Sequence, residues 1–328
     1  MPDPGFEKKI REDQKHINEI KSEIGKAVIG QDKVIDGFLK SIFANGSVLV
    51  EGVPGVAKTL IVRTLSKVMG CKFSRIQFTP DLLPTDIIGI TTYEKERGFY
   101  VLKGPIFANF ILADEINRAP PKVQSALLEA MQEKQVTIGR ETFPIMPPFF
   151  VLATQNPIES VGTYPLPEAQ IDRFLFKLNI TYPSEDEEQR ILLTNITTEK
   201  FEKYDLGQVS NPGKIIEIEE DVKKVYLDKK IERYIIQLVN ATRHPNKYSI
   251  KTGKYIEWGA SPRASIGLYI ASKADALMKG KSFVTPHNVK EVAHDVLRHR
   301  ILVSYEGQSE NINSDQIITE LLSKVPVP

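Results

Sequence analysis

Residues 48–59 read VLVEGVPGVAKT, a short β-branched run that passes directly into a glycine-containing turn. A strand, such a turn and then a helix is the context in which a phosphate-binding loop works. Backbone N–H groups of the loop and of the helix N-terminus can bind phosphate oxygens. Lys58 is expected to reach the β- and γ-phosphates, and the Thr59 hydroxyl to bind Mg²⁺. The stretch therefore predicts an ATP site and an open parallel sheet around it.

The whole loop contributes to this predicted site. Ala57 stands where the last glycine of such loops is usual, and a methyl group is tolerated there if the residue already has right-handed helical geometry. The alternative is a glycine-rich turn between strand and helix without a ligand. The predicted nucleotide-binding residues of the loop are Gly52, Val53, Pro54, Gly55, Val56, Ala57, Lys58 and Thr59.

A second apolar run, FILADE at residues 110–115, ends in two adjacent carboxylates. Asp114 is expected to hold Mg²⁺, directly or through water, and Glu115 to polarise the attacking water. An acidic pair after a strand is often a solvated loop. Its position downstream of a phosphate loop favours the catalytic interpretation.

Around these motifs, β-rich runs alternate with helical patterns, which is typical of a parallel sheet covered by helices. Residues 89–101 and 135–145 interrupt this alternation and are expected to form two hairpins. The predicted fold class is α/β: a P-loop core with a parallel sheet flanked by helices and two hairpin insertions, followed by a small all-α domain. The expected strands are 48–51, 73–78, 109–113, 149–154 and 174–180.

The chain divides into four expected parts. Residues 1–27 form a helical segment with Ile10, Ile17, Ile20 and Ile24 on one face. Residues 28–184 form the ATPase domain, 185–220 a linker and 221–328 the helical domain. The helices expected in the last part include 229–242, 263–279 and 286–303.

The composition limits the function. Among 328 residues, 43 Lys and Arg nearly balance 42 Asp and Glu, so the net charge of +1 creates no global field for a polyanion. The single Cys71 cannot form an internal disulfide, and no apolar run approaches the roughly 20 residues that span a bilayer. We expect a cytoplasmic protein without membrane insertion.

Two further stretches carry a resemblance. ADEINRAP at 113–120, continued by QSALLEAM at 124–131, resembles the MoxR family of AAA+ ATPases, and GVPGVAKT is that family's form of the loop. The likeness extends from about residue 28 to 303. It implies a P-loop AAA+ core, a helical lid, and ATP with Mg²⁺ as cofactors.

The resemblance also implies roles for residues outside the two motifs. Asn156 matches the sensor-1 position near the attacking water, and Arg173 matches an arginine finger supplied to a neighbouring subunit. Arg263 matches sensor 2, at the start of a lid helix that folds over the nucleotide, while Ile29 and Gly30 would line the adenine pocket. Each has a plain alternative. Asn156 could be a turn residue, and Arg173 could pair within the chain with Asp172 or Glu168. Arg263 could be a helix residue that faces solvent, and residues 29–30 could be an ordinary loop.

MoxR-like proteins imply a homo-oligomer, expected to be a hexameric ring, that couples ATP hydrolysis to chaperone-like remodelling or maturation of a partner protein complex. The implied client or co-factor is a protein with a von Willebrand factor A domain. In a ring the two hairpins would point toward the central opening, or else they are edge hairpins without a partner.

Two other functions remain open. A nucleic-acid motor of the same clade shares both hairpins, but the second hairpin sets Lys134 and Arg140 against Glu133 and Glu141, so nucleic acid is an unlikely partner. A nucleotide-dependent binding switch with negligible turnover is disfavoured by the presence of Glu115, Asn156 and Arg173.

Overall fold

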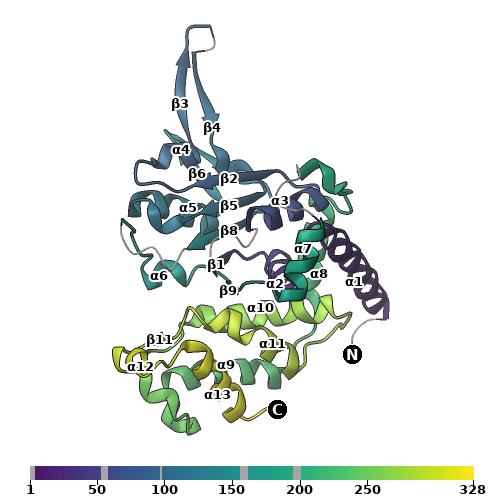
Figure 1. The fold of residues 1–328 in the computed structure, drawn as a ribbon, viewed down its shortest axis with the longest axis vertical. Helices are drawn as coiled ribbons and strands as arrows, with labels where there is room; N and C mark the ends of the chain where they lie inside the picture. The colour runs from purple at the N-terminus through teal and green to yellow at the C-terminus, as the bar shows by residue number, and fades with distance from the viewer. Residues whose placement is uncertain (1–3, 53–57, 97, 156–161, 195–200) are drawn as a thin grey trace.

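A five-stranded parallel sheet forms the centre of the protein (Figure 1). The computed structural model describes residues 4–52, 58–96, 98–155, 162–194 and 201–328. The strand order is β2-β5-β8-β1-β9. All four pairings are parallel, so the strands end together at what we call the carboxyl edge and begin together at the amino edge. The strands are β1 (Val48–Gly52), β2 (Phe73–Gln77), β5 (Phe110–Asp114), β8 (Phe150–Gln155) and β9 (Phe176–Ile180).

Both faces of the sheet are covered, because successive side chains of a strand point to opposite sides. In β5, Phe110 and Leu112 belong to one buried cluster, while Ile111 and Ala113 belong to the other. The first cluster also contains residues of α1 (Pro4–Ile24), α2 (Asp32–Phe43) and α3 (Lys58–Val68). The second is closed by α4 (Pro84–Ile88) and α5 (Pro121–Glu133). The predicted α/β core is confirmed.

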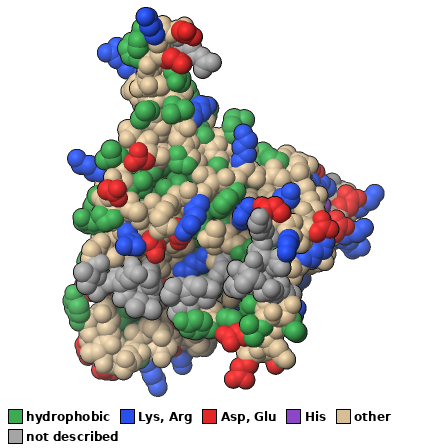
Figure 2. Space-filling view, turned by 45° about the horizontal axis from the view of Figure 1, so that its top comes forward, with side chains coloured by type: hydrophobic (Ala, Val, Ile, Leu, Met, Phe, Trp, Pro, Cys, Tyr) green, Lys and Arg blue, Asp and Glu red, His purple; other side chains and the backbone are tan. Residues whose placement is uncertain are grey.

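Both predicted hairpins are present. β3 (Gly89–Glu94) pairs with β4 (Gly98–Lys103) in an arm that projects beyond the sheet at the top of Figure 1. β6 (Gln135–Ile138) and β7 (Glu141–Pro144) form the second, shorter hairpin. Figure 2 shows apolar side chains along the projecting arm, and the exposed ones include Tyr93 and Phe99.

The C-terminal part is helical and lies beneath the sheet in Figure 1. It also contains a small ribbon of β10 (Ile256–Trp258) and β11 (Leu302–Val303). The helix expected over 286–303 is therefore wrong at its end: α11 stops at Leu297, and the side chains that follow bond the carbonyls that lead into and along β9 instead of continuing a helix. The helices of this part are α8 (Pro212–Lys224), α9 (Lys229–Arg243), α10 (Pro262–Met278), α11 (Pro286–Leu297), α12 (Tyr305–Ser309) and α13 (Ser314–Lys324).

The remaining described helices are short elements within and between the two parts. They are η1 (Pro105–Phe107), η2 (Ile116–Arg118), α6 (Glu168–Ile171), α7 (Glu185–Thr194), η3 (Phe201–Tyr204), η4 (Pro245–Tyr248) and η5 (Thr252–Tyr255). α8 runs across the boundary expected between residues 220 and 221, so the division into domains stays a prediction. None of the described helices is both long and apolar enough to cross a bilayer.

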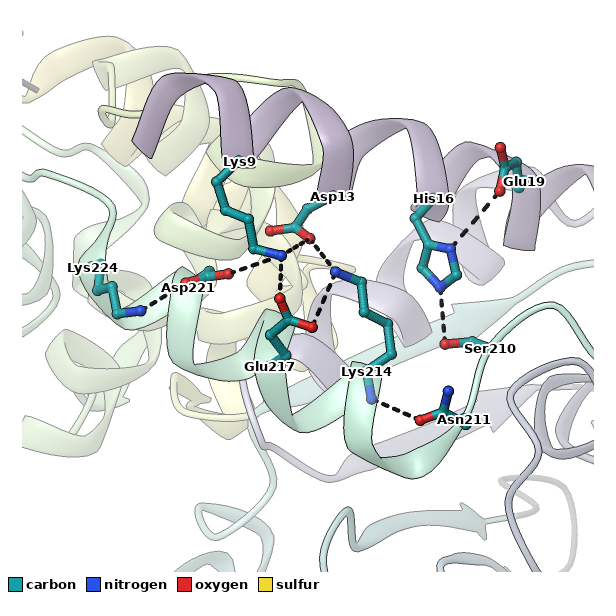
Figure 3. A network of polar contacts seen from close by, with 10 residues as sticks. All are labelled: Lys9, Asp13, His16, Glu19, Ser210, Asn211, Lys214, Glu217, Asp221 and Lys224. Carbon is teal, nitrogen blue, oxygen red and sulfur yellow. Dashed lines mark hydrogen bonds and ion pairs between the residues drawn. The ribbon is translucent and has the colours of Figure 1, made fainter. Parts of the chain in front are cut away.

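Helix α1 is joined to α8 by a network of ion pairs (Figure 3). The Asp13 carboxylate is fully buried, and its Oδ1 accepts hydrogen bonds from Lys214 Nζ at 2.8 Å and from Lys9 Nζ at 3.3 Å. Glu217 bonds the same two lysines from α8. The isoleucine face of α1 is buried beside this network, so apolar and ionic contacts together fix the N-terminal helix.

Candidate active site

The carboxyl edge brings together the ends of four neighbouring strands. Gln77 ends β2, Asp114 ends β5, Gly52 ends β1, and Thr154 lies one residue before the end of β8. Open parallel sheets bind ligands outside the carboxyl ends of their strands. Sequence motifs separated by about 60 residues thus meet at one place.

Lys58 opens helix α3 directly after the loop. Its Nζ donates a hydrogen bond to the Gly52 carbonyl at 3.0 Å. Burial lowers the pKa of Lys58, while the charges of Asp114 and Glu115 act in the opposite direction. Among the described residues no carboxylate lies within ion-pair distance of this ammonium, so the cation is free to take an anion.

Gly52 is required by a close approach of two strands. A Cβ at this position would lie 2.6 Å from the Ile180 carbonyl oxygen of β9. A larger residue would push β1 and β9 apart exactly where the loop begins, so the glycine is structural as well as part of the motif.

Asp114 is held from two sides. Its Oδ1 accepts a hydrogen bond from Thr154 Oγ1 at 2.8 Å, and its Oδ2 accepts two from Arg75, from Nη2 at 2.7 Å and from Nε at 3.2 Å. Thr154 Oγ1 also accepts a hydrogen bond from the Glu115 N–H at 2.8 Å. One hydroxyl therefore orients both members of the acidic pair.

Glu115 has an unusual backbone conformation, with φ 56° and ψ 50° in the left-handed region. A non-glycine residue there is uncommon, and such conformations cluster at functional sites. Its Oε2 accepts hydrogen bonds from Gln77 Nε2 at 2.8 Å and from Arg118 Nη1 at 3.0 Å. Two contacts thus hold the carboxylate, and the bond from the Glu115 N–H to Thr154 fixes its backbone beside Asp114.

These residues fit a nucleotide with magnesium. Asp114 Oδ1 keeps a lone pair beyond its one hydrogen bond from Thr154, whereas Oδ2 accepts two from Arg75. The Lys58 ammonium, which has no ion-pair partner among the described residues, matches a phosphate oxygen. Thr59 follows Lys58 in the first turn of α3.

Two predictions lie outside the described residues. They are the loop residues Val53, Pro54, Gly55, Val56 and Ala57, and the sensor-1 residue Asn156, which directly follows β8.

Ile29 and Gly30 lie near the same edge of the sheet. Ile29 is buried, and Gln31 Nε2 donates to the Thr181 carbonyl, just past the end of β9, at 3.4 Å. Gly30 has φ +73°, and a Cβ there would lie 2.7 Å from Cδ of Glu187 in α7. Their role in binding adenine stays a prediction.

Arg173 and Arg263 lie elsewhere, at the amino edge. Both line a cleft of about 390 Å³ with residues 44–47, which precede β1. Arg173 Nη1 donates to the Leu128 carbonyl at 3.3 Å, and Arg263 Nη1 lies 3.7 Å from Asp172 Oδ2. Helix α10, which carries Arg263 in its first turn, begins at the end of the sheet opposite Lys58. The closure of Arg263 over a nucleotide and the role of Arg173 as a finger therefore stay predictions.

Four polar residues of the site were not predicted from the sequence: Arg75, Gln77, Arg118 and Thr154. Gln77 and Arg75 belong to β2, whose place beside β5 follows from topology and not from any local pattern. Arg118 belongs to the ADEINRAP motif and Thr154 to an expected strand, and neither pattern indicates a role for the side chain. Their positions at or beside strand ends were the available signal.

Comparisons with known proteins agree with this arrangement. The family model of ATPases associated with various cellular activities (AAA) matches residues 47–176, and the AAA lid domain matches residues 251–321. The Mycobacterium tuberculosis protein called Chaperone MoxR1 is 47% identical over 93% of this chain and 81% of its own length. Protein MoxR of Methylorubrum extorquens is 29% identical over 93% of both chains.

A solved structure is also similar. The crystal structure of a candidate ATPase from Cytophaga hutchinsonii superposes with a TM-score of 0.91 at 48% sequence identity, over 98% of each chain. The similarity therefore includes the lid and the N-terminal helix as well as the sheet.

Proposed function

The chain belongs to the MoxR family of AAA+ ATPases, and from that premise we propose that it hydrolyses ATP with Mg²⁺ in a ring and remodels a partner protein in a chaperone-like cycle. One observation carries the proposal. Lys58, Asp114 and Glu115 gather at the carboxyl edge, whereas Arg173 and Arg263 lie at the amino edge.

The residues of the carboxyl edge can divide the chemistry among them. The loop amides, the Lys58 ammonium and the N-terminus of α3 would bind the phosphates. Asp114 and Thr59 would hold Mg²⁺, which neutralises charge that develops on the phosphate oxygens. Glu115, fixed by Gln77 and by its own N–H, would orient the attacking water and accept its proton.

The arginines would complete the site of a neighbouring copy. β1 has five residues, so its ends are separated by about 16 Å at the usual rise per residue, which is too far for Arg173 to bridge within one chain. A head-to-tail ring places the amino edge of one subunit against the carboxyl edge of the next. Arg173 would then contact the γ-phosphate, and Arg263, beside it, would do the same in trans.

The client would be a protein or protein complex. Support comes from the relatives named as chaperone and MoxR, and the implied partner class carries a von Willebrand factor A domain. The second hairpin does not support a nucleic-acid motor. Lys134 at its base is partly buried and donates to the Phe149 carbonyl at 3.4 Å, so it is not presented to a phosphate backbone. We therefore retain protein remodelling.

Two substitutions test the core of the proposal. Lys58→Ala should abolish ATP binding, because it removes a phosphate contact. Glu115→Gln should retain binding and lose turnover by at least about a hundredfold, because it removes the proton acceptor and leaves the phosphate contacts. Equilibrium binding of labelled ATP and release of phosphate measure the two effects separately.

The matched controls are Lys67→Ala on the exposed side of α3 and Glu129→Gln on α5. Both should behave as the unmodified protein. Normal turnover in Glu115→Gln would remove Glu115 from the mechanism, and full ATP affinity in Lys58→Ala would remove the phosphate site.

A further inference from the structure

A second cleft opens beside the arginine cleft and shares Asp172 with it. Its volume is about 520 Å³, and it separates helix α6 from the β10–β11 ribbon of the lid. Glu168 and Ala169 line one side, and Trp258 and Leu302 line the other, where these two residues are paired across the ribbon. Trp258 is 70% exposed although it is the largest apolar side chain of the lid.

The charged groups at the base of this cleft are already satisfied. Asp172 Oδ1 accepts from Arg300 Nε at 2.8 Å, and Asp172 Oδ2 accepts from Ser261 Oγ at 2.8 Å. Arg300 is 9% exposed and also donates to the carbonyls of Phe174 at 2.6 Å and Leu175 at 3.1 Å. All five N–H groups of Arg300 donate within the protein, and Asp172 is itself an anion, so the cleft does not suit a ligand anion.

The polar groups that remain are acceptors. Glu168 is exposed and has no polar side-chain partner among the described residues. His299 donates from Nε2 to the Phe174 carbonyl at 3.1 Å, which leaves Nδ1 as an acceptor without a partner in the described part of the chain. Burial and the nearby Arg300 hold the pKa of His299 well below its ordinary value, so the ring is neutral near pH 7 and does not repel a cation.

An exposed carboxylate and an exposed indole on opposite sides of one cleft can together recognise a flat cation. A guanidinium stacks on tryptophan through cation–π and planar contact, and its fork of N–H groups bonds a carboxylate. A lysine ammonium offers the charge without the planar surface. Guanidinium is therefore the preferred ligand chemistry.

We propose that this cleft binds the guanidinium of an arginine side chain from a second copy of the chain, between Trp258 and Glu168. The choice of a second copy rests on the proposed function, in which the adjoining arginine cleft faces a neighbouring subunit. The cleft would add a cation contact next to the catalytic one and would set how tightly two subunits associate.

Trp258 makes the test direct, because it is the single tryptophan of the sequence. N-acetyl-arginine amide, titrated at constant ionic strength, should change the tryptophan fluorescence in a saturable way. N-acetyl-lysine amide should bind several-fold more weakly. Glu168→Gln should weaken the arginine probe about tenfold, as expected for loss of a charge-assisted contact.

Glu257→Gln is the matched control. It removes the same charge next to Trp258 in sequence, but Glu257 is exposed and does not line the cleft. It should leave probe binding unchanged. The absence of saturable binding, or equal binding by the unmodified protein and Glu168→Gln, would overturn the proposal.

Self-association identifies the source of the guanidinium. In sedimentation velocity with ATP, Glu168→Gln should assemble at a higher protein concentration than Glu257→Gln. If the probe binds but both variants assemble equally, the assignment to a second copy is wrong. Because probe binding does not depend on turnover, the cleft can fail this test while the ATPase proposal stands, and the reverse also holds.

Discussion

At the scale of single residues, the hydroxyl of Thr154 contacts both members of the acidic pair. It donates to Asp114 and accepts from the N–H of Glu115, so it fixes the metal-binding carboxylate and the backbone of the proton acceptor together. The contact joins residues 40 positions apart. The sequence predicted both carboxylates from their local motif, but a partner on another strand depends on strand order.

Glu219 is a buried carboxylate on α8 that has no role in the candidate site. Burial raises its pKa from the ordinary 4.5 to about 7, against the opposing charge of Lys134. The folded state therefore binds this proton more tightly than the unfolded state. The stabilisation is complete below pH 4.5 and is lost as the pH rises through 7.

We predict that Glu219→Gln, which cannot ionise, removes this pH dependence. The pKa shift corresponds to about 3 kcal/mol. From pH 4.5 to pH 8 the unmodified protein should therefore lose about that much unfolding free energy relative to the variant. Urea denaturation across this range measures it. Glu220 is the exposed neighbour, and Glu220→Gln should show the same pH dependence as the unmodified protein. If Glu219→Gln also shows that same pH dependence, the pKa of Glu219 is not raised in the folded state.

At the scale of elements, local patterns predicted the strands and hairpins well, because alternation and flanking glycines act within a few residues. The end of α11 shows where this fails. Arg298 and His299 continue the helical pattern in sequence, yet their side chains bond the carbonyls of Lys177 and Phe174 on another element. A tertiary contact decided the boundary, and the short strand β11 followed from it.

Helix α1 depends on such a contact through Asp13. Asp13→Ala would leave Lys9 and Lys214 facing Glu217 without the buried carboxylate between them (Figure 3). Loss of one partner of a buried ion pair costs about 3 kcal/mol, and partial exposure of both lysines lowers this to about 2 kcal/mol. We predict a decrease of that size in the unfolding free energy, measured by urea denaturation.

Hydrogen exchange locates the effect of Asp13→Ala. Amides of α1 should lose protection before those of the sheet, since the network lies at the α1–α8 contact. Glu12→Ala is the control, because Glu12 is exposed and pairs with Lys8 at 3.9 Å. Equal losses in the two variants would mean that the network contributes nothing beyond a surface pair.

At the scale of the whole molecule, the two edges of the sheet each carry half of the expected catalytic groups. The resemblance predicted Arg173 as a finger for a neighbour and Arg263 at the start of a lid helix that folds over the nucleotide. Residue patterns do not say which subunit holds that nucleotide, because the position of α10 depends on how the lid packs against the sheet. The structure places both arginines in one cleft, so we expect the same behaviour from both.

The last prediction is that the active site is shared between subunits. Arg173→Ala should bind ATP and lose turnover by roughly 10³ to 10⁵, the range known for arginine fingers. Lys58→Ala should be inactive because it cannot bind ATP. In rings mixed from equal amounts of the two variants, a pocket from Arg173→Ala can face an arginine from Lys58→Ala. Random head-to-tail assembly makes about one interface in four complete, so a measurable part of the activity should return. Phosphate release measures the recovery, and sedimentation shows that mixed rings have formed.

The control mixes Arg173→Ala with the double variant Lys58→Ala/Arg173→Ala, which supplies no finger and should restore nothing. Without recovery in demonstrated mixed rings, Arg173 does not act across the interface.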